Sequence, residues 1–394
     1  MSRIFKCLAL ASWVAIFAVQ ISCNKQPTDQ GQINANEPPD TFFAPLPLDG
    51  STDNSFKLRL EWRGNDRDGR VAGYEYRVEG PFNDNNWQFT SSFFVDFKFR
   101  DGWYTVQVRA VDNNSNVDPT PASLRFHVKG PTFDKGLLIM DDWPQSTTEA
   151  QNDVYMDSLL IGAGYTNYTV WDYSEKFIPP LLPKFADADG LGAYTSIVWH
   201  THAGGNLGTN ERTLQDYLDM GGNLWIAGDN PLESLTGAPP AGVDFPTTKI
   251  VYRYFKVIRA NTAALNMDWL LAIDPVVSDL HTSYQIPNTP VVQYLTIQAN
   301  QLVAQPGVQY LYKFSTNYYR DPVRSININS ENFAGTSCAM VYDGASYNTA
   351  VFGFPLVFVV RAGPVFVNLI NTAAMTKAVE YVLSEVFQEP KGGN

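Results

Sequence analysis

The pattern of apolar residues changes at Gly130-Pro131, and this change limits the chain to a fold with two different halves. Before this point, short segments alternate apolar with polar residues. After it, continuous apolar segments alternate with amphipathic stretches. Alternating segments indicate a β-sandwich, whereas strands that alternate with helices indicate a parallel sheet with right-handed crossovers. We therefore predict a β-sandwich followed by an α/β domain.

The predicted strands of the first half have alternating side chains and are separated by Asp, Asn and Gly residues. They cover residues 56–62, 71–78, 93–99, 104–111 and 123–128. Short strands at this spacing are typical of an immunoglobulin-like sandwich. We place this domain at residues 41–129 and expect its core to contain three tryptophans, Trp62, Trp87 and Trp103.

Several aspartates of the first half lie on loops that a sandwich brings to one end. They are Asp66, Asp68, Asp112 and Asp118. Short carboxylates in loops commonly accept hydrogen bonds from the N–H groups of their own turn. Carboxylate oxygens are also the ligands that calcium prefers. We favour the turn role and keep a calcium site as the alternative.

The second half combines apolar strands with amphipathic helices, as an α/β domain requires. The predicted strands cover residues 135–140, 165–171, 194–200, 223–228 and 350–354. The predicted helices begin near residues 147, 210 and 372 and end near residues 161, 220 and 387. We place the domain at residues 130–388, with an irregular β-rich insertion at 246–347 and a tail at 389–394.

The first half resembles the fibronectin type III-like modules of secreted bacterial proteins, in particular the triple tyrosine module beside bacterial sensor propellers. The resemblance rests on Trp62, Tyr74, Tyr76 and the segments 101–104 and 108–112. It implies an immunoglobulin-like fold. It implies no activity, because sandwiches serve many roles.

The second half resembles class I glutamine amidotransferase-like domains. The resemblance rests on residues 214–229, with Gly-Gly-Asn-Leu leading into a strand, and on residues 351–356, with Gly-Phe-Pro-Leu following one. It spans about residues 135–230 and 349–387. It implies a flavodoxin-like parallel sheet.

The residues that give this family its activity are absent from the matching positions. Enzymes of the family carry a cysteine nucleophile on the tight turn after the strand that corresponds to 223–227. Here Ala227–Pro231 contains neither Cys nor Ser, and Pro355–Val357 replaces the His-Pro-Glu segment. Cys338 precedes the last strand, and we expect it to be a small core residue. We therefore expect no glutamine hydrolysis.

Polar side chains at the predicted strand ends are the best candidates for another site. They are Asp141, Asp142, His200, His202 and Asp229. Ligand sites of α/β sheets form at this edge. Asp141, His200 and His202 would suit a divalent metal, and His200 and His202 with Asp229 would suit a hydrolase without metal. The simpler interpretation makes Asp142 and Asp229 helix caps. We expect only one of the two imidazoles to face the crevice.

The N-terminus has the features of a lipoprotein export signal. Arg3 and Lys6 precede an apolar run, and Ser22 precedes Cys23. We predict that residues 1–22 are removed and that Cys23 is lipidated, although Gln20 replaces the usual leucine; the alternative is an ordinary secretory peptide cut near Ser22. Residues 23–40 are polar and predict a flexible linker.

The chain carries 28 Lys and Arg against 40 Asp and Glu, so its formal net charge is −12. An acidic surface repels phosphate backbones, which argues against a nucleic-acid partner. We expect a non-catalytic lipoprotein of the bacterial envelope without a cofactor, held at a membrane by its lipid and serving as a binding or scaffold module for an envelope protein or glycan. The alternatives are an envelope hydrolase of carbohydrate or peptide, and an assembly component whose sandwich packs on a partner.

Overall fold

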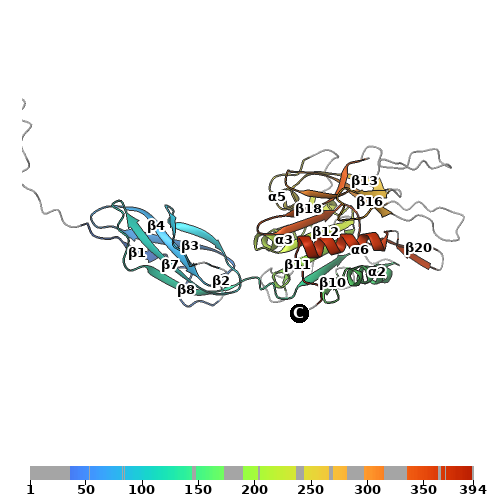
Figure 1. Ribbon diagram of the computed structural model, residues 1–394. Coiled ribbons are helices and arrows are strands. Elements are labelled where there is room, and N and C mark those ends of the chain that lie inside the picture. The colour runs from blue at the N-terminus through green and yellow to red at the C-terminus, as the bar shows by residue number, and fades with distance from the viewer. Residues whose placement is uncertain are drawn as a thin grey trace, which may run out of the picture.

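The computed structural model describes residues 36–392, except 53, 82, 84, 144–147, 173–189, 203–204, 237–243, 266–268, 282–296, 315–334, 363–364 and 369. Figure 1 shows two folded parts that follow each other along the chain and meet near Gly130. The predicted signal peptide and Cys23 lie outside the described residues. Among the described helices, none combines the length and apolar character needed to cross a membrane.

The N-terminal part is a two-sheet sandwich of a three-stranded and a five-stranded sheet. The smaller sheet has the order β1 (Asp40–Phe43), β3 (Lys57–Asn65), β6 (Phe94–Lys98). The larger sheet has the order β2 (Asn54–Ser55), β8 (Ala122–Lys129), β7 (Gly102–Asp112), β4 (Val71–Glu79), β5 (Gln88–Thr90). The predicted immunoglobulin-like sandwich is confirmed, and the strands that the sequence missed, β1, β2 and β5, are short.

The core of the sandwich contains one of the three tryptophans that were expected there. Trp62 is fully buried and packs against Phe43 and Tyr74. Trp103 is 40% exposed, and the guanidinium of Arg125 lies 4.2 Å from its ring centroid. Trp87 lies under two arginines at the surface, Arg77 and Arg109. The expectation was wrong for these two because cation–π contacts cover them on the outer face of the sheet.

The C-terminal part contains a sheet whose parallel section has the order β10-β9-β11-β12-β19. Its strands are β9 (Leu137–Asp142), β10 (Thr169–Asp172), β11 (Ser196–His202), β12 (Asn223–Asp229) and β19 (Asn348–Phe352). Each corresponds to a predicted strand. Strands β9, β11, β12 and β19 are buried on both faces, which explains why they are nearly continuous apolar runs.

Helices cover both faces of the parallel section (Figure 1). Helices α2 (Glu149–Gly162) and α6 (Thr372–Glu380) contact each other on one face, and α6 continues as a π-helical segment, Tyr381–Val386. Helix α3 (Glu211–Asp219) covers the other face. Side chains alternate along the strands, so Ile139 and Val198 belong to the core under α2 while Met140 and Trp199 belong to the core under α3.

The predicted insertion extends the main sheet. Strands β18 (Ser337–Asp343), β17 (Gln309–Phe314), β14 (Trp269–Ala272) and β15 (Leu280–His281) follow β19 in this order and pair antiparallel. Strands β13 (Val257–Leu265) and β16 (Ile297–Ala304) form a separate antiparallel pair. The described part of this segment is therefore β-rich as expected, but it is regular where an irregular structure was predicted.

The remaining described elements are short. They are η1 (Leu191–Ala193), α4 (Glu233–Thr236), α5 (Ile250–Arg253), and the strand pair β20 (Val359–Ala362) and β21 (Val365–Asn368). The predicted tail begins inside the domain, since Glu389 is buried and accepts a 2.6 Å hydrogen bond from Thr195 Oγ1. Cys338 is fully buried on β18, and burial raises the pKa of its thiol well above the ordinary value.

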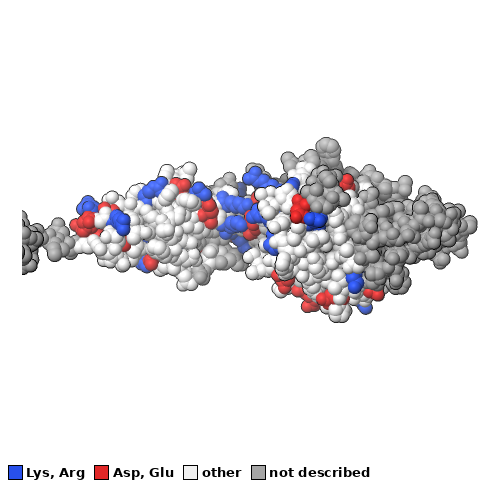
Figure 2. Space-filling view, turned by 90° about the horizontal axis from the view of Figure 1, so that it is seen from above, with Lys and Arg blue, Asp and Glu red and all other residues white. Residues whose placement is uncertain are grey.

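The two parts meet through an ionic contact. Lys57 of the sandwich bonds to Asp216 of α3, and Lys98 Nζ lies 3.1 Å from Asp219 Oδ2. Figure 2 shows basic side chains gathered where the two parts adjoin. Phe56 and Phe133 pack against the core beneath α3. The junction therefore combines complementary charge with apolar contact.

Candidate functional site

The strand alternation brings Asp141 of β9 and His200 of β11 to the same face of the sheet. The two residues are register partners, one strand apart. Ile139 and Val198, two residues earlier on the same strands, belong to the core under α2, so the side chains of Asp141 and His200 lie on that face of the sheet. These are the two strand-end candidates that the structure places in one cavity.

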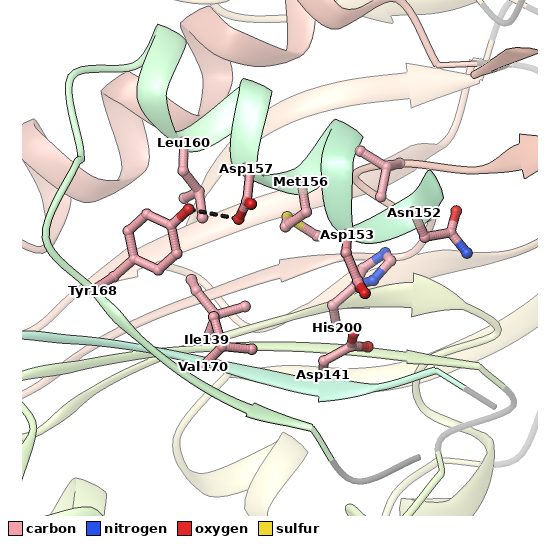
Figure 3. Close-up of a pocket in the computed structure, with 11 residues that line it drawn as sticks. Ile139, Asp141, Asn152, Asp153, Met156, Asp157, Leu160, Tyr168, Val170 and His200 are labelled. Carbon is pink, nitrogen blue, oxygen red and sulfur yellow. Dashed lines mark hydrogen bonds between the residues drawn. The ribbon is translucent and has the colours of Figure 1, made fainter. Parts of the chain in front are cut away.

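A pocket of about 240 Å³ lies between α2 and the ends of β9, β10 and β11 (Figure 3). We call it the α2 pocket. Its polar lining consists of Asp141, Asn152, Asp153, Asp157, Tyr168 and His200. Its apolar lining consists of Ile139, Met156, Leu160, Val170 and Val357. A concave site with apolar walls and a few converging polar groups is typical of a small-molecule site.

His200 forms the inner wall of the α2 pocket. Its side chain is 3% exposed, and Nε2 has no hydrogen-bond partner among the described residues. Trp143 stacks on the imidazole at a centroid distance of 4.9 Å. Burial lowers the pKa of His200 to about 3, because the charged form loses its hydration. His200 is therefore neutral at physiological pH and carries an unused polar atom.

The carboxylates of the α2 pocket influence one another. Burial raises the pKa of Asp153, the charges of Asp172 and Asp157 raise it further, and a hydrogen bond with Asp141 opposes the rise. A hydrogen bond between two carboxyl groups requires that one of them holds a proton. Asp157 accepts a 2.6 Å hydrogen bond from the hydroxyl of Tyr168, shown as a dashed line in Figure 3. The rim of the pocket is thus acidic.

His202 and Asp229 form a second group at the same sheet edge. They are register partners on β11 and β12, and His202 Nδ1 lies 3.0 Å from Asp229 Oδ2. The hydrogen bond to Asp229 raises the pKa of His202 despite partial burial. Both imidazoles contact Trp143. Of the two, only His200 lines the α2 pocket, although residues two apart on a strand share a face.

Asp142 lies on the opposite face and stabilises a loop. Its carboxylate accepts bonds from Trp199 Nε1 at 3.0 Å and from the backbone and side-chain nitrogens of Asn206 at 2.6 and 2.8 Å. Burial raises the pKa of Asp142, and these donors oppose the rise. Asp142 therefore bonds to β11 and the segment that follows it, and the N-cap position of α2 is Thr148 rather than Asp142.

The turn after β12 has a buried asparagine at its tip. Asn230 has a φ of 50° and is 6% exposed. Its Oδ1 accepts bonds from Asn300 Nδ2 at 2.7 Å and Thr262 Oγ1 at 3.1 Å, and its Nδ2 donates to Glu233 at 2.6 Å. Both polar atoms of its side chain are therefore bonded within the fold.

The described residues contain no group of three or more His, Cys, Asp or Glu side chains in an arrangement that would hold a metal ion. The residues Asp141, His200 and His202 do not form such a group, and neither do the sandwich aspartates. Instead, Asp112 Oδ1 accepts from the backbone of Asn114 and Asn116, each at 2.8 Å. Asp118 accepts from the backbone of Thr120 at 2.8 Å. Asp66 Oδ1 accepts from the backbone of Asp68 at 3.3 Å.

Sequence reasoning missed the half of the pocket that α2 contributes. Asn152, Asp153 and Asp157 lie on the side of α2 that faces the sheet or at the edges of that side, and they line the pocket. Trp143, which covers both histidines, was also missed. The available signal was the Asp153-x-x-x-Asp157 spacing, because residues four apart lie on one side of a helix.

The sequence matches no protein family and no curated protein. Solved structures with similarity include the fibronectin(III)-like modules of CbhA from Clostridium thermocellum, 17% identical, with 23% of this chain and 96% of that chain covered and a TM-score of 0.19. The PKD1 domain of Epp from Vibrio anguillarum is 22% identical, with 24% and 99% covered and a TM-score of 0.18. The extracellular domain of BT4673 from B. thetaiotaomicron is 15% identical, with 21% and 12% covered and a TM-score of 0.17. These values are low, and the sandwich assignment rests on the strand pairing described above.

Proposed function

We propose that this protein is an exported, lipid-anchored protein of the bacterial envelope. In this proposal, Cys23 carries the lipid and the sandwich acts as a spacer. The spacer presents an α/β domain that binds a small ligand and carries out no reaction. The acidic charge of the chain agrees with a role that involves no nucleic acid.

The proposed α/β domain is flavodoxin-like and related to class I glutamine amidotransferase-like domains. Numbered in chain order, the parallel strands β9, β10, β11, β12 and β19 lie in the order 2-1-3-4-5, which is the flavodoxin-like order. The left-handed backbone of Asn230 at a strand-to-helix turn also supports this relation, since the family places its nucleophile on such a turn.

The loss of catalysis is inferred from what replaces the reactive groups. Asn230 is hydrogen-bonded within the fold and has no nucleophilic atom. Pro355 and Val357 are buried apolar residues where the family has its histidine and glutamate. Cys338 is sealed in the core, and its raised pKa keeps the thiol protonated. The groups that perform the known reaction of the family are therefore absent from the corresponding positions.

The observation that carries the binding proposal is the unpartnered Nε2 of His200 beside an acidic pocket. A buried polar atom without a partner costs about 1–3 kcal/mol, so such atoms in native proteins call for an explanation. A ligand that supplies the missing hydrogen bond is that explanation. It would lie at the strand ends, where α/β folds bind their ligands.

Histidine-selective nitrogen NMR of the full chain tests this proposal. The chain has four histidines, so individual imidazole signals are resolvable. We expect at least one member of a panel of small amines, polyols and carboxylates to shift the His200 signals while those of His127 on the sandwich stay fixed. If no compound of the panel changes the His200 signals, the binding proposal is wrong. If the protein converts a compound of the panel into a product, the module is not non-catalytic.

A hydrolase is the second candidate, and the His202–Asp229 pair favours it. A carboxylate that orients an imidazole is the arrangement of a general base. His202 is 43% exposed at the side chain and is therefore accessible. If the protein hydrolyses peptides or glycans, the activity should be lost in His202→Gln and kept in His127→Gln. The binding proposal predicts no activity in any of these proteins.

A further inference from the structure

We propose that the α2 pocket binds an ammonium group carried on a short alkyl chain. This inference rests on the proposed binding function and names the class of its ligand. It is argued from the charge of the pocket, the hydrogen-bonding character of its polar atoms and the distribution of its apolar walls.

The charge of the pocket favours a cation. Asp141, Asp153 and Asp157 line it, and Asp172 is the register partner of Asp141 on the neighbouring strand. The lining residues include neither Lys nor Arg. His200 does not neutralise the carboxylates, because burial keeps its imidazole uncharged at physiological pH. Several carboxylates close together, without a cation among the lining residues, disfavour one another's ionisation, and a bound cation relieves this repulsion.

The polar atoms of the pocket are mostly acceptors, which favours a ligand rich in donors. Ionised carboxylates only accept hydrogen bonds, and a neutral imidazole offers one accepting nitrogen. Asp153 and Asp141 lie within hydrogen-bonding reach of each other, so one ammonium group can donate to both carboxylates. An ammonium group supplies three donors, enough to serve both carboxylates and His200 Nε2 together. Charged hydrogen bonds of this kind are stronger than neutral ones.

The apolar walls favour an alkyl chain behind the charged group. Ile139 and Val170 form the sheet side of the pocket, and Met156 and Leu160 form the helix side (Figure 3). The volume of about 240 Å³ exceeds what a bare metal ion needs. Among the described residues, the carboxylates also lack the arrangement that a metal requires. A short alkylammonium matches the acidic end and the apolar walls together.

The same chemistry has two sources, a free amine and the side chain of a lysine in a peptide. Both present an ammonium on an alkyl chain. A free amine would occupy the pocket alone, whereas a lysine would bring a peptide backbone to the rim formed by α2. The probes below separate these sources.

Binding to the full chain is measured by titration calorimetry and by the histidine NMR signals, at low salt. The probes are butylammonium, 1-butanol, butyrate, methyl glucoside and N-acetyl-lysine amide. We expect butylammonium to shift the His200 signals with millimolar affinity, the order for a ligand of about five heavy atoms. We expect butanol to bind about tenfold more weakly or not at all, and butyrate not to bind. Tighter binding of N-acetyl-lysine amide than of butylammonium would identify a peptide as the source; the reverse would identify a free amine.

Charge-removing variants locate the interaction. Asp153 lies at an exposed position of α2, so Asp153→Asn should fold and should weaken butylammonium binding about tenfold. Asp244→Asn is the matched control, because Asp244 is an exposed aspartate outside the pocket lining that pairs with Arg259. We expect the control to bind as the wild type does. Equal binding to the wild type and Asp153→Asn would overturn the assignment of the ammonium group to this rim.

The outcomes separate this inference from the function on which it rests. If methyl glucoside or butanol shifts His200 and butylammonium does not, the ligand class is wrong and the binding function stands. If no probe of the five changes the His200 signals, both fail. If butylammonium and butanol bind equally, the pocket recognises the alkyl chain and the ammonium inference is wrong.

Discussion

The buried imidazole of His200 makes a specific prediction for acid stability. In the folded protein, burial lowers the pKa of His200 from 6.5 to about 3. The unfolded chain therefore takes up a proton at this residue below pH 6.5, and the folded chain does not. The stability that comes from a neutral His200 is complete above pH 6.5 and is lost as the pH falls towards 3. Replacing His200 with glutamine, which does not titrate, should remove this part of the pH dependence.

The magnitude follows from the two pKa values. Within the affected range, each pH unit lowers the free energy of unfolding by up to about 1.4 kcal/mol for one proton. Between pH 7 and pH 5 the unfolded His200 becomes almost fully protonated, and the folded one stays neutral. The contribution of His200 therefore falls by about 2 kcal/mol over this interval. The wild type should lose this much more stability than His200→Gln.

Urea denaturation followed by circular dichroism at the helix band measures this difference. All described helices lie in the α/β domain, so the signal reports that domain and not the sandwich. Carboxylates and His202 titrate in both proteins, and their effects cancel in the comparison. His127→Gln is the control and should keep the pH dependence of the wild type. If wild type and His200→Gln lose stability in parallel between pH 7 and pH 5, then His200 is not buried as a neutral group.

Three further predictions concern the sheet edge, the strand packing and the anchor. The hydrogen bond to Asp229 raises the pKa of His202 above 6.5, so its stabilising effect is complete below that pH and is lost as the pH rises through the raised value. His202→Gln should therefore destabilise the protein by up to about 1 kcal/mol at pH 6 and less at pH 9, as read by urea denaturation. Gly228→Ala should cost about 3 kcal/mol or prevent folding, because the added Cβ would lie 1.8 Å from the carbonyl oxygen of Thr201. Cells grown with a clickable fatty acid should label the wild type and leave Cys23→Ser unlabelled.

Each of these predictions has a control and a contradicting outcome. Gly162→Ala at the end of α2 meets Thr376 at 3.4 Å, an ordinary contact, and should leave stability unchanged or raise it by about 0.5–1 kcal/mol. A stable, soluble Gly228→Ala protein would refute the packing of β11 on β12. Cys338→Ser should keep the lipid label, and a label that survives in Cys23→Ser would remove the anchor. Greater destabilisation by His202→Gln at pH 9 than at pH 6 would reverse the sign argued for that pair.

Much of the secondary structure follows from local sequence patterns. The continuous apolar run at Leu137–Met140 and the alternation of residues 104–111 determine their strands because burial requires those periods. The segment 246–347 was harder to interpret. Its strands β17 and β18 pair with their neighbours in the main sheet, and pairing partners are set by tertiary contacts.

The candidate site was predicted in part. Asp141 and His200 were found because they end neighbouring apolar strands, where α/β ligand sites form. Asp153 and Trp143 were missed, since a helical aspartate and a loop tryptophan have no sequence signal that links them to a strand end. The sequence pattern places Asp141, His200 and His202 at one sheet edge, but it does not determine the distances and angles that a metal site requires. Among the described residues, these three do not form a metal site.

The sequence by itself determined where the longer strands and helices outside segment 246–347 form, that two kinds of domain follow each other, and that the turn at Asn230 lacks a nucleophile. These properties depend on residue identity and on the period of apolar side chains. Only the tertiary structure decided that α2 closes a pocket over His200, that Trp143 seals the imidazole, and that the carboxylates of α2 and β9 share one cavity. The reason is physical: protonation and ligand binding depend on which groups are desolvated together, and that is set by how distant segments pack.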